Sequence, residues 1–494
     1  MKRTLAVLLV VILLLPLVAC GGGASSLVTE EETGTLIRTV TETVTGGVSG
    51  DHEAAGFSAG FGRRDVTPTE PVPLGGYGNS GFRIHTRVLD PLYVTCIALM
   101  DENGERMLIF QFDQLNIPGT FGEQIFKMVE KSTGIPRDHV LLNATHDHSG
   151  PDIGSEASGI STWKASTYKR SVEAAQDALA DLDACTGVFA GTTETDRLNF
   201  VRRYYKENGF VCDNADYGTG EIIGRETPVD EEMRLVKFAR KNQPDIVIAN
   251  WQCHNQRTSG STKTDLSSDF IGVFRRETEK ELGVKMLFLQ GGAGNIDPNS
   301  RIAGEARYSD YQDVGRALYE HLAEGLKNNM KEVAMGAIRA ESATITGTCN
   351  HDREELVARC DEIYGVWVSN NVEKAKMLCK EYGISSPYEA SAIISRSKRG
   401  KSEDFTVNCY AFGDVGIAAA PFEVFCQTYR DLRAVSPFAM TLTCGYSNDS
   451  QGYIPAAECW ANQGYEVVTC KYVMGTAEEM SAKQLEMLAE LKAK

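Results

Sequence analysis

Two histidines separated by a single residue form the segment of this sequence with the most evident chemical use. Residues Thr145–Pro151 read Thr-His-Asp-His-Ser-Gly-Pro and follow the apolar run Val140–Leu142. Such a pattern predicts a buried strand that ends in a polar turn. Side chains two residues apart on a strand face the same way, so His146 and His148 are expected to share a face. The pair could bind a metal, could divide into one ligand and one proton carrier, or could be structural histidines at a turn.

Two other predicted strands end in residues that can bind a metal. His254 follows a strongly apolar run, and Glu423 follows paired strands predicted over Val407–Ala420, where we expect it in the first turn of a helix. With His146 they would form a His₂Glu set with an open position, which is typical of catalytic zinc. Zinc acidifies bound water and polarises a carbonyl, which suits amide or ester hydrolysis, and His148 would be in reach to move protons. Alternatively, His254 is a core histidine whose hydrogen bonds are all made within the protein, and Glu423 stabilises the N-terminus of its helix through the helix dipole.

Strand-like and helix-like segments alternate in a way that indicates the fold class. Strands are predicted at Phe57–Gly62, Tyr93–Met100 and Arg106–Phe112, and a helix at Gly122–Lys131 precedes the histidine strand. This order predicts a mixed sheet. We therefore expect an α/β protein with a mixed β-sheet core flanked by helices, in a single large catalytic domain over residues 57–494.

The first residues look like a bacterial lipoprotein signal peptide. Lys2 and Arg3 precede the apolar run Leu5–Val18, which is short for a membrane span and leads to Cys20. We predict a signal over residues 1–20 with Cys20 lipidated, and a flexible tether over residues 21–56, rich in Gly, Thr, Ser and Glu. The protein would then be anchored by lipid at the outer face of a membrane of the bacterial cell envelope. An ordinary secretory signal is the alternative.

Charge and cysteine content exclude several classes of protein. The formal net charge of −17 argues against nucleic acid as a partner and against electrostatic binding to anionic lipid. The twelve cysteines after Cys20 form no CxxC pair, so a structural zinc cluster is not expected. We interpret most of them as small buried hydrophobic residues.

Together, these segments resemble the neutral/alkaline, non-lysosomal ceramidase family over almost the whole predicted domain. The resemblance rests on an ordered set of pieces: Gly60–Thr67, Ile84–Arg87, Thr145–Pro151, Asn199–Arg202, Asn250–His254, Ser268–Asp269, Pro421–Glu423 and Gly452–Tyr465.

The resemblance implies roles for individual residues. The zinc ligands of the family match His146, His254, Glu423 and Tyr453, and its catalytic residues match His148, Tyr465 and Arg202. In the family, the residue at His148 carries protons, and the one at Tyr465 stabilises the tetrahedral oxyanion. The match at Arg202 is softer, because Val201 stands where the family has asparagine. The implied cofactor is Zn²⁺, and the implied partner is a lipid-like amide substrate.

Two departures from the family shape the predicted function. Gly291 stands where the family carries a serine implicated in catalysis or in gripping the substrate amide, so we predict direct attack by zinc-activated water. The chain ends about thirty residues after Tyr465, and we expect no C-terminal immunoglobulin-like domain.

We predict a zinc-dependent hydrolase of an N-acyl amide bond that, like a ceramidase, releases a fatty acid from N-acylsphingosine or a related lipid amide. The alternatives are a hydrolase of another amide or ester, and a catalytically weak lipoprotein that binds a ligand on the same scaffold.

Overall fold

The computed structural model describes residues 56–77, 83–212, 215–216, 219–351, 354–369, 371–384 and 386–494. These residues belong to one compact unit. The predicted signal peptide with Cys20, and the tether apart from Gly56, lie outside them. Over the described residues, no helix combines the length and the apolar character that a membrane crossing needs.

A nine-stranded mixed sheet forms the larger part of the unit. Its order is β14-β12-β11-β6-β1-β3-β4-β5, and a ninth strand, β16, pairs with β6. The pairs β4–β5 and β12–β14 are parallel and the others antiparallel. The bounds are β1 Ser58–Asp65, β3 Tyr93–Met100, β4 Arg106–Phe112, β5 Val140–Ala144, β6 Asp183–Glu194, β11 Glu232–Arg240, β12 Ile246–Trp251, β14 Lys285–Gln290 and β16 Lys331–Val333.

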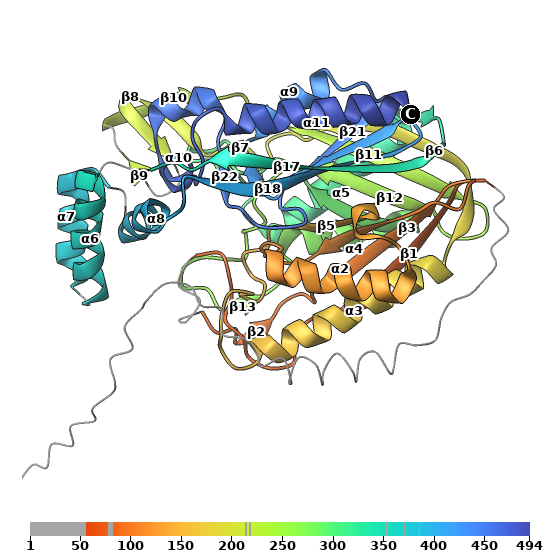
Figure 1. Cartoon of the computed structure of the whole chain (residues 1–494), viewed down its shortest axis with the longest axis horizontal. Helices are drawn as coiled ribbons and strands as arrows, with labels where there is room; N and C mark the ends of the chain where they lie inside the picture. The colour runs from red at the N-terminus through yellow and green to blue at the C-terminus, as the bar shows by residue number, and fades with distance from the viewer. Residues whose placement is uncertain are drawn as a thin grey trace, which may run out of the picture. The chain divides into compact units, whose positions relative to one another are not determined.

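Helices α2 (Gly119–Thr133) and α3 (Ile160–Ala180) lie along this sheet, on the side opposite α11 in Figure 1. Two glycines of β1 allow α3 to approach the strand closely. A Cβ atom at Gly60 would lie 2.0 Å from the Ala178 carbonyl oxygen, and one at Gly62 would lie 2.1 Å from that of Ala174. The Gly-Phe-Gly sequence of β1 thus decides where α3 packs. Helices α4 (Asp269–Leu282) and α5 (Tyr311–Asn328) pack together beside β14 and β6.

A second, four-stranded sheet packs face to face on the first. Its order is β17-β18-β19-β21, with bounds Ile338–Thr348, Ser402–Phe412, Val415–Ala419 and Met440–Cys444. One hydrophobic core joins Leu141 and Leu289 of the first sheet to Tyr410 and Leu442 of the second. Helices α9 (Cys426–Ala434) and α11 (Thr476–Ala493) cover its other face (Figure 1). The predicted mixed α/β fold is therefore confirmed.

The remaining elements are short or lie at the edge of the unit. They are β2 Arg87–Val88, η2 Arg137–His139, β7 Phe200–Val201, β8 Arg203–Cys212, β9 Ala215–Asp216, β10 Thr219–Arg225, β13 Asp265–Leu266, β15 Ile296–Asp297, α6 Glu354–Val368, α7 Val372–Tyr382, α8 Pro387–Ser397, β20 Glu423–Val424, β22 Tyr453–Ile454, η3 Ala457–Asn462 and α10 Tyr465–Thr469. Eleven of the twelve described cysteines are buried, as their apolar surroundings in the sequence predict.

Candidate metal centre and active site

The two histidines of the motif meet in a turn and not on a strand. Strand β5 ends at Ala144, and His146 adopts a left-handed backbone with φ of 58°. This turn brings the Nε2 atoms of His146 and His148 to 3.2 Å from each other. The expectation that both lie on one strand face is therefore wrong in its geometry, although the two rings do converge. A positive φ is costly for a residue with a side chain, and such strain persists where surrounding contacts enforce it.

Backbone carbonyls fix the tautomer of two of the histidines. The Nδ1 atom of His146 lies 2.9 Å from the Leu115 carbonyl oxygen. That of His254 lies 2.8 Å from the Ala293 oxygen and 2.9 Å from the Ile296 oxygen. A carbonyl can only accept, so each Nδ1 carries the hydrogen and each Nε2 presents a lone pair. This arrangement is the usual one for histidines that bind a metal through Nε2.

Glu423 and Tyr453 reach the histidines together. They are direct partners in the parallel pair of β20 and β22, each only two residues long. The Glu423 Oε2 atom lies 3.2 Å from His146 Nε2 and 3.4 Å from His254 Nε2. We expected Glu423 in the first turn of a helix, but α9 begins only at Cys426. The glutamate is thus positioned by strand pairing, and its side chain keeps 18% exposure, which leaves the cluster open to solvent on this side.

The spacing of these atoms fits a small divalent metal. Four atoms bound tetrahedrally to zinc at about 2.0–2.1 Å lie roughly 3.3–3.4 Å from one another. The separations of 3.2, 3.2 and 3.4 Å that link His148, His146, Glu423 and His254 match this value. His146, His148 and His254 also form a group whose ligand atoms all lie within 4.8 Å of one another. His148 is therefore close enough to serve as a ligand, and its predicted role as proton carrier stays a prediction.

A buried glutamine holds the two histidine loops in place. Gln290, the last residue of β14, donates from Nε2 to the Thr145 carbonyl at 2.8 Å and to the Cys253 carbonyl at 2.6 Å. Its Oε1 accepts from the Cys253 amide at 3.2 Å. Asn143 on β5 accepts from the Gln290 amide, which joins the two edge strands of the sheet. We did not predict this role, although a buried amide side chain at the end of an apolar strand could have indicated it.

Arg202 and Tyr465 complete the set of predicted site residues. The Arg202 Nη1 atom lies 3.2 Å from His254 Nε2, and its Nη2 donates to the Tyr453 hydroxyl at 3.1 Å. The ring of Tyr465 lies 5.5 Å from that of Tyr453. All seven predicted ligands and catalytic residues thus gather around one cluster, with Tyr465 joined to it through Tyr453.

Sequence reasoning missed Tyr446. This tyrosine is buried and has a φ of 52°. Its ring lies 4.1 Å from that of His146, and its hydroxyl lies 3.5 Å from Glu423 Oε2. No spacing in the sequence links Tyr446 to the histidines. Only the strained turn after β21 brings it there. We therefore call His146, His148 and His254 the histidine side of the site, and Glu423, Tyr446 and Tyr453 the oxygen side.

The electrostatics of the cluster favour the protonation states that a metal requires. Burial, with Arg202 next in effect, lowers the pKa of His254 to about 4. Burial also lowers the pKa of His148 well below its usual value. For Glu423, burial alone raises the pKa, but His146 and His254 outweigh it and hold the pKa well below its ordinary value. These shifts favour neutral His148, neutral His254 and ionised Glu423, the forms in which these groups ligate divalent metals.

Glycines let the loop after β14 pass close to the oxygen side. A Cβ atom at Gly294 would lie only 2.3 Å from the Glu423 carbonyl oxygen. One at Gly291 would lie 3.0 Å from Gln252 Oε1 and 3.2 Å from the Trp251 oxygen. The position of the family serine is therefore buried against Gln252.

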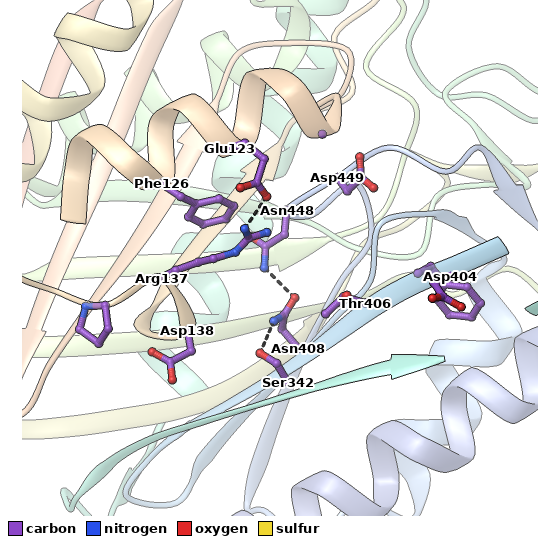
Figure 2. Close-up of a pocket in the computed structure, with 13 residues that line it drawn as sticks. Glu123, Phe126, Arg137, Asp138, Ser342, Asp404, Thr406, Asn408, Asn448 and Asp449 are labelled. Atoms are coloured by element: carbon purple, nitrogen blue, oxygen red, sulfur yellow. Dashed lines mark hydrogen bonds and ion pairs between the residues drawn. The ribbon is translucent and has the colours of Figure 1, made fainter. Parts of the chain in front are cut away.

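A large cavity elsewhere in the protein is separate from this cluster. Its volume is about 730 Å³, and it lies between α2 and β18. Figure 2 shows the Glu123–Arg137 ion pair and the hydrogen bonds that join Asn448, Asn408 and Ser342 on its walls. None of the predicted site residues lines it. Cavity size alone therefore does not locate the site, which is defined by converging ligands.

The fold and the site together define a mixed α/β protein with a buried histidine–carboxylate cluster in the segments that follow its strands. No family model matches the chain. Among solved structures, it is similar to the crystal structure of the neutral ceramidase from Pseudomonas aeruginosa, with a TM-score of 0.68 and 16% identity over 89% of this chain and 75% of that one. It is also similar to a ceramidase complexed with C2, with a TM-score of 0.66 and 14% identity over the same shares. The chain therefore has the fold of the neutral ceramidases.

Proposed function

We propose that the protein is a zinc-dependent hydrolase of an N-acyl amide bond in a lipid, either ceramide or a related lipid amide. The observation that carries the proposal is the convergence of His146, His254 and Glu423 at tetrahedral ligand spacing. The shared fold with neutral ceramidases supports the class of substrate. A lipid on Cys20 would keep the enzyme at the outer face of a bacterial membrane.

The residues around the cluster suit this chemistry. When bound, zinc supplies an acidified water and polarises the amide carbonyl. Tyr453, the predicted fourth ligand, is held by Arg202. A neutral His148 can take a proton and return it to the leaving amine. Tyr465 can donate a hydrogen bond to the oxyanion that develops on the substrate.

The test combines metal analysis with turnover of a fluorescent ceramide. We expect about one zinc per chain, and hydrolysis that stops on chelation and returns when zinc is added. His146→Ala should lose both zinc and turnover, while His139→Ala, which removes a histidine outside the cluster, should keep both. A purified protein that binds no zinc, or that hydrolyses ceramide after complete chelation, would contradict the proposal.

The absence of a serine at position 291 favours a route without an acyl-enzyme. Mass spectrometry of protein quenched during turnover should then find no acyl adduct on any side chain. An adduct that forms and decays at the rate of turnover would replace this route with a covalent one.

The glycine at position 291, where the family carries a serine, also supports a second candidate function, in which the protein binds a lipid amide and hydrolyses it poorly. Zinc binding together with no turnover across a broad panel of amides and esters would favour this candidate. Turnover of a non-ceramide amide in that panel would instead identify a hydrolase of different specificity.

A further inference from the structure

Arg202 places a positive charge next to the candidate metal centre. Its Nη1 atom lies 3.2 Å from His254 Nε2, the atom predicted to bind the metal. Its side chain is 6% exposed, so water does little to screen the guanidinium. A bare guanidinium at this position would repel a divalent cation. The site therefore needs a counter-charge on the far side of Arg202.

Glu466 supplies that counter-charge from a fully buried position. Its Oε1 accepts from Arg202 Nε at 2.8 Å, and its Oε2 accepts from Arg203 Nη1 at 2.7 Å. Burial alone raises the pKa of Glu466, but Arg202 and Arg203 outweigh it and hold the pKa below its ordinary value. The carboxylate is thus ionised and bridges two adjacent arginines.

The position of Glu466 in the chain links two predicted catalytic residues. It directly follows Tyr465, at the start of α10. Its carboxylate fixes one edge of the Arg202 guanidinium, while Nη2 of the same group donates to the Tyr453 hydroxyl and to the Gly294 carbonyl. The Glu466 carboxylate therefore holds Arg202, which contacts both sides of the site. The same carboxylate also anchors the segment that carries Tyr465.

We propose that Glu466 is a positioning residue for the metal centre, which neutralises and orients Arg202 so that the guanidinium supports Tyr453 without expelling the metal. The inference rests on the proposed function, since it assumes that the cluster binds zinc. The hydrogen bonds of the Glu466 carboxylate go to Arg202 and Arg203, so Glu466 acts on the metal centre through Arg202. Groups that orient metal sites in this way typically change metal affinity by about 10- to 100-fold when they are altered.

The chain offers a closely matched control. Glu226 is also buried and pairs with Arg203, accepting from its Nη2 at 2.9 Å, with a side chain 3% exposed. Glu466→Gln and Glu226→Gln each remove one negative charge from the same buried group of ions. Glu466 accepts a hydrogen bond from Arg202, whereas Glu226 accepts from Arg203, so the two variants separate an effect on the metal centre from a general loss of charge.

The experiment measures Zn²⁺ affinity by competition with a chromophoric chelator, in the full chain and without substrate. We expect Glu466→Gln to weaken zinc binding by about 10- to 100-fold, and Glu226→Gln to weaken it less, because its charge lies one arginine further from the metal centre. Glu466→Asp keeps the charge, so its affinity should lie between those of the wild type and the Gln variant. The visible spectrum with Co²⁺ should change in the Glu466 variants and stay like the wild type in Glu226→Gln.

Several results would overturn the inference. Equal zinc affinity in the wild type and Glu466→Gln would exclude a role of Glu466 at the metal centre. Equal losses of zinc affinity in Glu466→Gln and Glu226→Gln would show that the loss of any buried negative charge has this effect, and that Glu466 does not position Arg202. Should Glu466→Gln fail to fold, wild-type zinc affinity in a folded Glu466→Asp whose Co²⁺ spectrum is unchanged would also count against it. A wild-type protein without zinc affinity would overturn the proposed function as well. A wild-type protein that binds zinc but hydrolyses no lipid amide would contradict the proposed function and leave the role of Glu466 untouched.

Discussion

The histidine side and the oxygen side of the site are built in different ways. His146 and His254 follow β5 and β12, regular strands of the large sheet, and hydrogen bonds from the buried Gln290 hold their loops. Glu423 and Tyr453 come from two-residue strands that extend beyond the second sheet. Their place depends on backbone pairing and on the close approach of a glycine loop.

This difference implies that mutations on the two sides affect fold stability and zinc binding differently. On the histidine side, ligand geometry and fold stability share the same buried hydrogen bonds, so a change there costs both. On the oxygen side, the ligands rest on strands only two residues long, so we expect a change there to displace the ligand at a smaller cost to the fold. The following predictions test this contrast, from the largest expected effect to the smallest.

Gln290→Leu should be the most damaging change. It leaves two carbonyls and one amide buried without partners, each at a cost of about 1–3 kcal/mol. We expect the free energy of unfolding to fall by about 3–5 kcal/mol in urea denaturation, together with a loss of zinc binding. Gln312→Leu, the same change at an exposed glutamine, should alter neither. Wild-type stability in Gln290→Leu would show that the two histidine loops keep their conformation without the hydrogen bonds of Gln290.

Acid should destabilise the metal-free protein through the histidine side. The pKa of His254 is about 4 in the folded chain, against an ordinary value of 6.5. Between these values the unfolded chain binds a proton that the folded chain does not. The free energy of unfolding therefore falls as pH drops from about 6.5 to about 4, by up to about 3 kcal/mol from this residue.

Urea denaturation of the metal-free protein at about pH 7 and about pH 4.5 measures this effect. His254→Gln should shrink the difference between the two pH values, while His351→Gln, at an exposed histidine, should leave it unchanged. An unchanged difference in His254→Gln would mean that other groups carry the acid sensitivity.

Gly294→Ala tests the contact between the two sides. The new methyl group would lie 2.3 Å from the Glu423 carbonyl oxygen, so the glutamate backbone must move. We expect a loss of about 1–3 kcal/mol in the free energy of unfolding. Zinc affinity should fall by more than this loss of stability alone would cause, because the glutamate ligand is displaced. Gly365→Ala, in a helix with open space around the new methyl, should cause no loss of either. Zinc affinity retained in Gly294→Ala would show that the oxygen side adapts more easily than we expect.

Gly291→Ser should have the smallest effect. Its Cβ would lie 3.0 Å from Gln252 Oε1, a tight contact that small shifts can relieve, at a cost of roughly 1 kcal/mol. Because the serine would press against Gln252, we expect ceramide hydrolysis to stay within about threefold of the wild type. A much larger gain in turnover would show that the family serine can still act in this site.

Local patterns in the sequence predicted the strands and the residues that follow them, because an apolar run that ends in polar residues is a short-range signal. The same patterns placed His146 and His148 on one pleat and Glu423 in a helix, and both placements were wrong. Left-handed turns at His146 and Tyr446 depend on contacts from distant segments, which no local pattern records. The supporting role that we propose for Glu466 escaped prediction for the same reason.

By itself, the sequence determined which chemistry was available: the histidines, the glutamate and the tyrosines, each after a strand or in a matching motif. Only the tertiary structure decided that the Glu423 carboxylate lies 3.2 Å from the Nε2 atom of His146 and 3.4 Å from that of His254. That spacing arises in segments that follow strands of the two sheets, and the packing of these sheets is a sum of many non-local apolar contacts. The ligands could be recognised one at a time, but their geometry belongs to the folded chain as a whole.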